Sequence, residues 1–272
     1  MAAINAYRMD GLGNDFIIID RREKFIEIKK NKIIELGNRA NIGFDQIIFI
    51  EKQREDSYPI TIYNSDGGEV SACGNGARCV AYLLSENLNT KKIQIKTNNR
   101  LLNAKIVGDF QVELEMGKPL FETEEIPLSK KINPNNVVLD INNQKFSEGF
   151  CVNVGNPHII FFNKDYLKHD LRVIGPKIEN HDLFPEKTNV TFANVIDKKN
   201  IKVNVWERGA GLTKACGTAA CATAVASFSK NLTERKVQIA FDQGSLKIEY
   251  NKDKNIFMTG PVSKINELSI SI

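Results

Sequence analysis

The sequence has no apolar run long enough to span a membrane. Its 272 residues are 42% hydrophobic and 26% charged, and no stretch approaches the roughly 20 apolar residues that a transmembrane helix needs. The first residues, MAAINAYRMDG, also lack the basic segment and the apolar stretch of a secretory signal peptide. We therefore expect a cytoplasmic protein without a membrane partner.

Dense basic segments and phosphate-binding loops are also absent. Lys and Arg number 37 against 33 Asp and Glu, and no basic block is interleaved with aromatic residues. The clusters DRREK and EIKKNK are typical of solvated surfaces. Neither GxxxxGK[ST] nor a GxGxxG after a strand occurs. The sequence therefore predicts no nucleic-acid partner and no nucleotide cofactor.

Cysteine and histidine are too irregularly spaced for a disulfide framework or a zinc site. The chain has five cysteines without a CxxC, and its three histidines lie far from any short ligand spacing. We therefore expect no metal. Cys79, Cys151 and Cys221 are predicted to be core residues, because most thiols without a partner are buried. Cys73 and Cys216 stand apart because each lies in a glycine-containing motif.

An internal repeat is the strongest signal in the chain. ACGNGA recurs as ACGTAA, and the two cysteines, Cys73 and Cys216, are 143 residues apart (216 − 73). Nearly the same offset relates ITIYN to VNVWE, DQIIF to TNVTF, GNDFII to GNPHII and MGKP to TGPV. Several matches in one order indicate two homologous halves. The first runs to about Pro119, and the second from there to about Val262.

Both halves predict a mostly β fold with one central helix. Short β-type runs in the first half are FIIID, QIIFI, ITIYN, KIQIK and VELEM, and their counterparts include HIIFF, VTFANV, VNVWE, VQIAF and LKIEY. Helical periodicity follows in Ala77, Val80, Ala81, Leu84 and Leu88, and again in Cys221, Ala224, Val225 and Phe228. We expect an α+β fold of two pseudo-symmetric domains, each a curled, barrel-like, mostly antiparallel sheet around its helix.

The symmetry of the repeat also predicts a site. Residues that are polar or reactive in both halves are expected to face a shared cleft: Asn14 with Asn156, Gln46 with Asn189, Asn64 with Glu207, Cys73 with Cys216, and Asn75 with Thr218. Each cysteine precedes a helix, whose dipole and free N–H groups lower a thiol pKa from about 8.5 toward neutrality and bind a carboxylate. Two such thiols suit the racemisation or epimerisation of a carbon next to a carboxylate. In that reaction the carbon loses a proton from one face and gains a proton on the opposite face.

The motifs around these residues resemble the diaminopimelate epimerase family over essentially the whole chain. They are GLGNDF, NSDGGEVSACGNGARC, VNVGNPH, FPEKTNVTF, WERGAG and ACGTAACA. The resemblance implies two barrel-like domains, with the C-terminal strand returned to the first, which gives domains 1–118 plus about 263–272 and 119–262. It implies a cofactor-independent, homodimeric isomerase of lysine and cell-wall precursor biosynthesis that interconverts LL- and meso-2,6-diaminopimelate.

The resemblance also implies roles for individual residues. Cys73 and Cys216 would be the acid/base thiols, with His158 and Glu207 tuning their pKa. Arg208 would pair with the distal carboxylate of the substrate, and Glu207 and the Asn side chains would hold its distal ammonium. The substrate-binding set would be Asn14, Gln46, Asn64, Gly74, Asn75, Asn156, Asn189, Glu207, Arg208, Gly217 and Thr218.

Two departures and two alternatives stand beside this interpretation. The chain has IGFDQ and GAGLT where the family often has IGADQ and GAGET, so Phe44 and Leu212 are expected to reshape the cleft.

One alternative is a proline-type racemase or phenazine-type isomerase on the same scaffold. WERGAG and NSDGG argue against proline because they suit a substrate charged at both ends, and a phenazine-type isomerase does not need both thiols. The other alternative is a binding protein that senses redox state through its paired cysteines.

Overall fold

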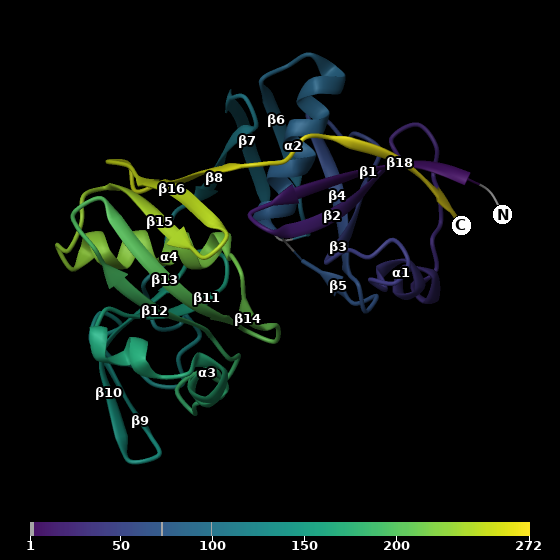
Figure 1. Ribbon diagram of the computed structural model, residues 1–272. Coiled ribbons are helices and arrows are strands. Elements are labelled where there is room, and N and C mark those ends of the chain that lie inside the picture. The colour runs from purple at the N-terminus through teal and green to yellow at the C-terminus, as the bar shows by residue number, and fades with distance from the viewer. Residues whose placement is uncertain (1–2, 72, 99) are drawn as a thin grey trace. The chain divides into compact units, whose positions relative to one another are not determined.

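Two units, each built around its own helix, make up the part of the chain that the computed structural model describes, residues 3–71, 73–98 and 100–272 (Figure 1). Unit 1 comprises Met1–Glu115 with Thr259–Ile272, and unit 2 comprises Met116–Met258. None of the helices described is long and apolar enough to cross a membrane.

Unit 1 wraps a curled sheet around helix α2 (Gly74–Leu88). The C-terminal strand β18 (Asn266–Ser271) pairs with the first strand, β1 (Ala3–Gly11), so both ends of the chain contribute to this unit. Its other strands are β2 (Asn14–Asp20), β3 (Gln46–Ile50), β4 (Ser57–Asn64), β5 (Glu69–Val70), β6 (Lys92–Lys96), β7 (Leu101–Gly108) and β8 (Gln111–Gly117), which runs on into unit 2.

Unit 2 repeats this plan around helix α4 (Gly217–Ser229). Its strands are β9 (Val137–Ile141), β10 (Gln144–Asn153), β11 (Pro157–Phe161), β12 (Asn189–Val195), β13 (Asn200–Glu207), β14 (Gly211–Thr213), β15 (Lys236–Phe241), β16 (Gly244–Tyr250) and β17 (Ile256–Pro261), which runs on into unit 1. A 3-10 turn, η1 (Lys164–Lys168), and helix α3 (Leu171–Glu179) follow β11.

Strand pairing is equivalent in the two units. The pairs β2–β3 and β11–β12 are parallel, as are β4–β6 and β13–β15. The pairs β3–β4 and β12–β13 are antiparallel, as are β6–β7 and β15–β16. The predicted α+β fold with two pseudo-symmetric, mostly antiparallel domains around central helices is therefore confirmed.

Small side chains allow each central helix to lie close to its strands. Gly76 in α2 is so close to β3 that a Cβ atom there would lie 2.6 Å from Ile48 Cδ1. Nearly every residue of α4 is buried, and six of its thirteen residues are Gly or Ala. The predicted core cysteines Cys79, Cys151 and Cys221 are confirmed as fully buried.

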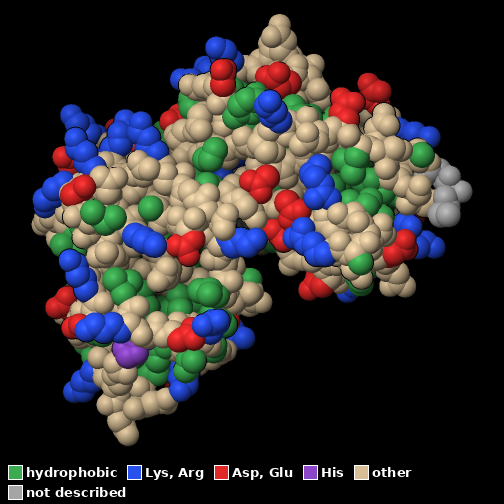
Figure 2. Space-filling model, in the orientation of Figure 1, with side chains coloured by type: hydrophobic (Ala, Val, Ile, Leu, Met, Phe, Trp, Pro, Cys, Tyr) green, Lys and Arg blue, Asp and Glu red, His purple; other side chains and the backbone are tan. Residues whose placement is uncertain are grey.

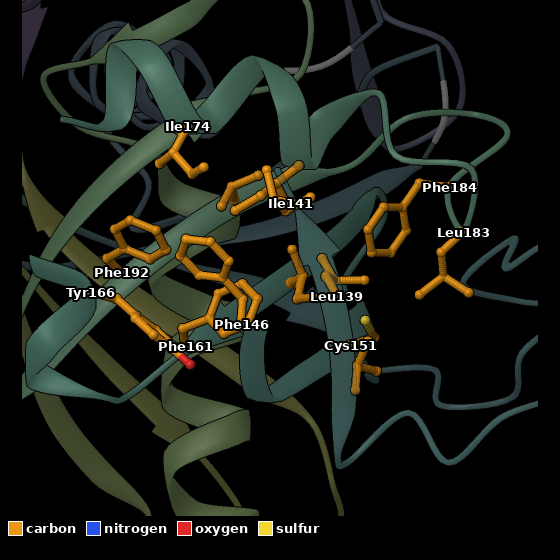
Figure 3. Close-up of a cluster of buried hydrophobic side chains, with 14 of the residues drawn as sticks. Leu139, Ile141, Phe146, Cys151, Phe161, Tyr166, Ile174, Leu183, Phe184 and Phe192 are labelled. Carbon is orange, nitrogen blue, oxygen red and sulfur yellow. The ribbon is translucent and has the colours of Figure 1, made fainter. Parts of the chain in front are cut away.

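The opposite face of each sheet packs a second helix over a hydrophobic cluster. In unit 1, α1 (Lys30–Gly37) covers an isoleucine-rich cluster that includes Ile17, Ile47 and Phe44. Phe44 is 1% exposed, so the expectation that it reshapes a cleft is wrong: its ring fills the core beneath α1. In unit 2, α3 covers an aromatic cluster with Phe146, whose ring lies 4.8 Å from that of Tyr166 (Figure 3).

The surface carries charges of both signs. On the face shown in Figure 2, Lys and Arg are intermixed with Asp and Glu. Several opposite charges are paired, for example Lys236 with Glu249 at 2.6 Å and Lys168 with Asp165 at 2.8 Å. Exposed pairs of this kind contribute little to stability, so they bear mainly on solubility.

Candidate active site

Each motif cysteine is the N-cap residue of its central helix. The Cys73 sulfur accepts a hydrogen bond from the Gly76 N–H at 3.4 Å, and the Cys216 sulfur accepts one from the Ala219 N–H at 3.5 Å. Both cysteines have extended backbone geometry, as N-cap residues do. The repeat therefore places two sulfur atoms in the same position relative to equivalent helices.

The helix ends beside the two sulfurs provide a place for a carboxylate. The first N–H groups of an α-helix have no partner within the helix and carry the positive end of its dipole. These groups belong to Gly74 and Asn75 in α2 and to Gly217 and Thr218 in α4. The four residues named from the sequence thus lie where an anion binds most readily.

In unit 1, three of the proposed substrate-binding residues lie at the ends of β2, β3 and β4. The Cys73 thiol donates to Asn14 Oδ1 at 3.8 Å. Gln46 and Asn64 are directly opposite each other in the β3–β4 ladder, and Gln46 Nε2 donates to Asn64 Oδ1 at 3.0 Å. Gln46 Oε1 is buried without a hydrogen-bond partner among the described residues, so it can accept one from a bound molecule.

Asp15, Asp45 and Arg39, which were not predicted from the sequence as site residues, hold Asn14 in place. Asn14 Nδ2 donates to Asp45 Oδ2 at 3.0 Å, and the Asp15 N–H donates to the same oxygen at 3.1 Å. Arg39 donates to both Asp15 and Asp45. Because Asn14 Nδ2 is held by a carboxylate, its Oδ1 is the atom turned toward the Cys73 thiol.

In unit 2, the second cysteine lies beside a carboxyl group. Glu207 lies beside Cys216, and burial raises the pKa of Glu207. Cys216 is 5% exposed, and its sulfur lies 3.4 Å from Thr218 Oγ1. Burial, followed by the charge of Glu207, raises the pKa of Cys216 well above its usual value. The expectation of a lowered pKa is therefore wrong for this thiol, because burial and the charge of Glu207 outweigh the hydrogen bonds with Thr218 and the Ala219 N–H.

His158 and Asn156 form a pair at the start of β11. His158 Nε2 lies 2.9 Å from Asn156 Oδ1, and the ring is completely buried. Burial, and next the charge of Arg208, lowers the pKa of His158 to about 3, so the ring is neutral near pH 7. A neutral His158 donates from Nε2 and orients Asn156.

Arg208 is held by its backbone and by one arm of its guanidinium group. Its N–H donates to Asn189 Oδ1 at 3.0 Å, and Asn189 Nδ2 donates to Pro157 O at 2.7 Å. Arg208 Nη1 donates to Glu186 O at 2.8 Å. The rest of this exposed guanidinium group faces solvent and can bind an anion. Leu212, the middle residue of β14, is 51% exposed.

No group of three His, Cys, Asp or Glu side chains in the described ranges is arranged to hold a metal ion. The residues around each motif cysteine form one half-site in each unit. Each combines a thiol, amide groups and free helix N–H groups. Such a set can bind a carboxylate and exchange a proton with a carbon beside it.

Comparison with known proteins identifies the family. The diaminopimelate epimerase family model matches residues 6–122 and 150–265. The chain belongs to the diaminopimelate epimerase family. A diaminopimelate epimerase of Pelagibacter ubique is 51% identical over 272 residues, which cover 99% of each chain. A diaminopimelate epimerase of Bartonella quintana is 40% identical over 258 residues, which cover 93% of this chain and 90% of that one.

Solved structures with low sequence identity have the same fold. A phenazine biosynthesis protein of the PhzF family from Bacillus anthracis superposes with a TM-score of 0.67 at 14% identity, and the match covers 100% of both chains. At this identity the likeness concerns the fold alone. This chain thus shares its fold with proteins of distant sequence, and the fold alone does not decide the reaction.

Proposed function

We propose that the protein interconverts LL- and meso-2,6-diaminopimelate by moving one proton between its two motif thiols and the substrate α-carbon. Membership of the diaminopimelate epimerase family supports the substrate. The observation that carries the mechanism is the repetition of one device: Cys73 and Cys216 each cap a helix whose free N–H groups can hold a carboxylate.

The proposed reaction needs only a base and an acid. The thiolate of one cysteine takes the α-proton, and the electron pair of the C–H bond remains on the α-carbon and its carboxylate. Helix N–H groups stabilise the negative charge that develops there. The thiol of the other cysteine then gives its proton to the opposite face, which inverts the carbon and leaves the first cysteine protonated. No metal, pyridoxal phosphate or nucleotide takes part.

The surroundings of each thiol support a division of roles. Because burial and Glu207 raise the pKa of Cys216, this cysteine is held as a thiol and suits the proton donor. Asn14 Oδ1 accepts from Cys73 and can orient it toward a substrate. The reverse reaction exchanges the two roles. For transfer at one carbon, each sulfur must come within roughly 3–3.5 Å of that carbon, and the proposal requires the two units to meet the substrate in this way.

Residues of unit 2, together with Asn64 and Gln46 of unit 1, are assigned to the distal end of the substrate. Arg208 offers a planar guanidinium group to the distal carboxylate, while Glu207 and the amide oxygens of Asn64 and Asn156 take the distal ammonium. Gln46 and Asn189 complete the set. A substrate charged at both ends uses these groups, whereas proline does not.

Proton exchange with solvent tests the proposal directly. With LL- or meso-diaminopimelate in deuterated water, we expect deuterium at the α-carbon of the epimerised product, measured by NMR and mass spectrometry. Dialysis against a chelator should leave the rate unchanged, and substrate should protect the enzyme from inactivation by iodoacetamide. Absence of α-carbon exchange with both isomers contradicts the proposed reaction.

A cytoplasmic homodimer belongs to the same proposal, on the strength of the resemblance to the family. Sedimentation of the purified chain tests the oligomeric state, and twice the monomer mass of 30.5 kDa is expected. A mass that stays at the monomer value contradicts this part alone, because the chemistry of the thiols does not depend on it.

A further inference from the structure

A buried carboxylate lies outside the motifs that carry the proposed chemistry. Glu179, the last residue of α3, is 5% exposed. Its Oε2 accepts from Trp206 Nε1 at 2.7 Å, and its Oε1 accepts from the Gly209 N–H at 3.0 Å. Lys187 Nζ lies 4.0 Å from Oε1. A buried charge is unfavourable unless it is paired. Here both oxygens of Glu179 accept hydrogen bonds from one short segment, residues 206–209.

That segment carries the two charged residues of the second half-site. Trp206 and Gly209 are the residues immediately before and after Glu207 and Arg208, so one carboxylate bridges both ends of the segment. Gly209 has a positive φ of 75°, which places the turn in a conformation that favours glycine. Asn189 holds the Arg208 N–H from the other side. The backbone of Arg208 is thus fixed between two anchors.

Packing adds a third constraint on the same segment. The Trp206 ring lies against Gly175 of α3, where a Cβ atom would come within 2.6 Å of Trp206 Cγ. The ring also packs against the aromatic cluster of unit 2. Trp206 therefore packs against the core of unit 2 and lies next to the turn that contains Arg208. Its Nε1–H makes the polar contact with Glu179.

The equivalent place in unit 1 shows that the fold does not require this carboxylate. The offsets of 143 and 142 that relate the two halves match Glu179 to Leu36 and Gly37, the last two residues of α1, and neither is acidic. The equivalent turn of unit 1 is held by backbone hydrogen bonds, from the Ser65 N–H to Asp45 O at 3.0 Å and from the Asn64 N–H to Gly68 O at 2.8 Å. The carboxylate is therefore found in the half that carries Arg208.

We propose that Glu179 is a positioning residue that fixes Arg208 for binding of the distal carboxylate of the substrate. This inference rests on the role of Arg208 in the proposed function. Two parallel hydrogen bonds between a guanidinium and a carboxylate demand a defined orientation of the arginine. Glu179 supplies that orientation through the backbone on both sides of Glu207 and Arg208, without touching the substrate.

The test compares Glu179→Gln, Arg208→Ala and the double variant. Glutamine keeps the volume of Glu179 but turns an NH₂ group toward Trp206 or Gly209, so one anchor is lost. We expect KM for diaminopimelate to rise by roughly 10- to 100-fold, with kcat changed less. Arg208→Ala should raise KM further, and the double variant should be no worse than Arg208→Ala, because Glu179 acts through Arg208. The control is Glu234→Gln, the same exchange at an exposed glutamate of unit 2.

Two further measurements separate positioning from folding. The rate at which iodoacetamide alkylates Cys216 without substrate should match the wild-type rate in Glu179→Gln, since the thiol itself is not disturbed. Should Glu179→Gln fail to fold, Trp206→Phe replaces it, because this change removes the Nε1–H and keeps an aromatic ring. It should raise KM in the same direction by a smaller factor.

The outcomes distinguish this inference from the function on which it rests. If Arg208→Ala raises KM but Glu179→Gln, or Trp206→Phe in its place, does not, the positioning role is wrong and the proposed function stands. Additive effects in the double variant also contradict the positioning role, because Glu179 would then act independently of Arg208. If Arg208→Ala leaves KM unchanged, the assignment of the distal carboxylate is wrong, and the positioning role falls with it.

Discussion

The two motif cysteines occupy the same position of a repeated motif in different surroundings. Cys73 is half-buried at the start of α2, and its thiol donates to the Asn14 amide. Cys216 is almost fully buried at the start of α4, beside the carboxyl group of Glu207. In unit 1 the position of Glu207 is taken by Asn64, a neutral residue that accepts from Gln46.

This difference shows how a duplicated fold can place two equivalent cysteines in different electrostatic surroundings. The helix N-terminus, where an anion can bind, comes with the motif, and both units have it. The charges around it are set by single residues on neighbouring strands, and these differ. A duplicated half-site can therefore keep its binding geometry while one thiol is shifted toward the protonated form.

Loss of either sulfur should have the largest effect. Cys73→Ala and Cys216→Ala should each lower kcat/KM for epimerisation by roughly 10²- to 10⁴-fold or more, because each removes a group that transfers a proton. Cys221→Ala is the matched control, since this thiol is buried in α4. Its variant should lose stability but keep near wild-type kcat/KM. Near wild-type epimerisation by either motif variant would mean that one half-site is sufficient.

Removal of the carboxylate should make the two half-sites more alike. In Glu207→Gln the pKa of Cys216 should fall, because the negative charge that favours its protonated form is lost. The pH at which iodoacetamide alkylates Cys216 half-maximally, followed by peptide mass spectrometry, should move to lower pH. Cys73 in the same samples is the internal control. An unmoved midpoint for Cys216 would show that burial alone sets its pKa.

A smaller effect concerns stability at mildly acidic pH. Unit 2 has a buried histidine, His158, near the start of β11, whereas unit 1 has Phe16 at the equivalent position of β2. The pKa of His158 is about 3 in the folded protein and about 6.5 when unfolded, so the unfolded state binds more protons between these values. Stability should fall by about 2 kcal/mol from pH 6.5 to pH 5 because of this group.

The pH dependence of unfolding in urea measures this contribution. His158→Phe should lose it, whereas His169→Asn, at a half-buried histidine, is the control and should keep it. The two variants must be compared over the same pH range, since carboxyl groups titrate in both. Parallel stability curves for His158→Phe and the wild type would contradict a buried, neutral His158.

The sequence predicted the parts of the structure that depend on local patterns. All ten quoted β-type runs fall on strands, with only Phe162 of HIIFF beyond the end of β11, and both central helices lie where the apolar period is 3.6. Helix α3 was not predicted, because Gly175 and Pro176 within it disfavour a helix. Gly175 allows the Trp206 ring to pack against this helix. That contact joins residues far apart in the chain, and no local pattern reports it.

The candidate site shows the same limit. The repeat identified both cysteines and their polar partners, because duplication leaves a signal in the sequence. The pKa of Cys216 and the depth of Phe44 depend on burial, which only the folded chain defines. Glu179 was missed for a related reason. The corresponding end of α1 in unit 1 is Leu36–Gly37, so the repeat gives no sign of a carboxylate there.

The most direct test of two thiols acting on opposite faces uses Cys73→Ser and Cys216→Ser with each stereoisomer of a halogenated substrate analogue. In each variant the remaining thiol can still abstract a proton from its own face, and loss of halide makes that step visible without reprotonation. The two variants should eliminate halide slowly and with opposite stereochemical preference. If both variants prefer the same isomer, the two thiols do not serve opposite faces and the proposed mechanism is wrong.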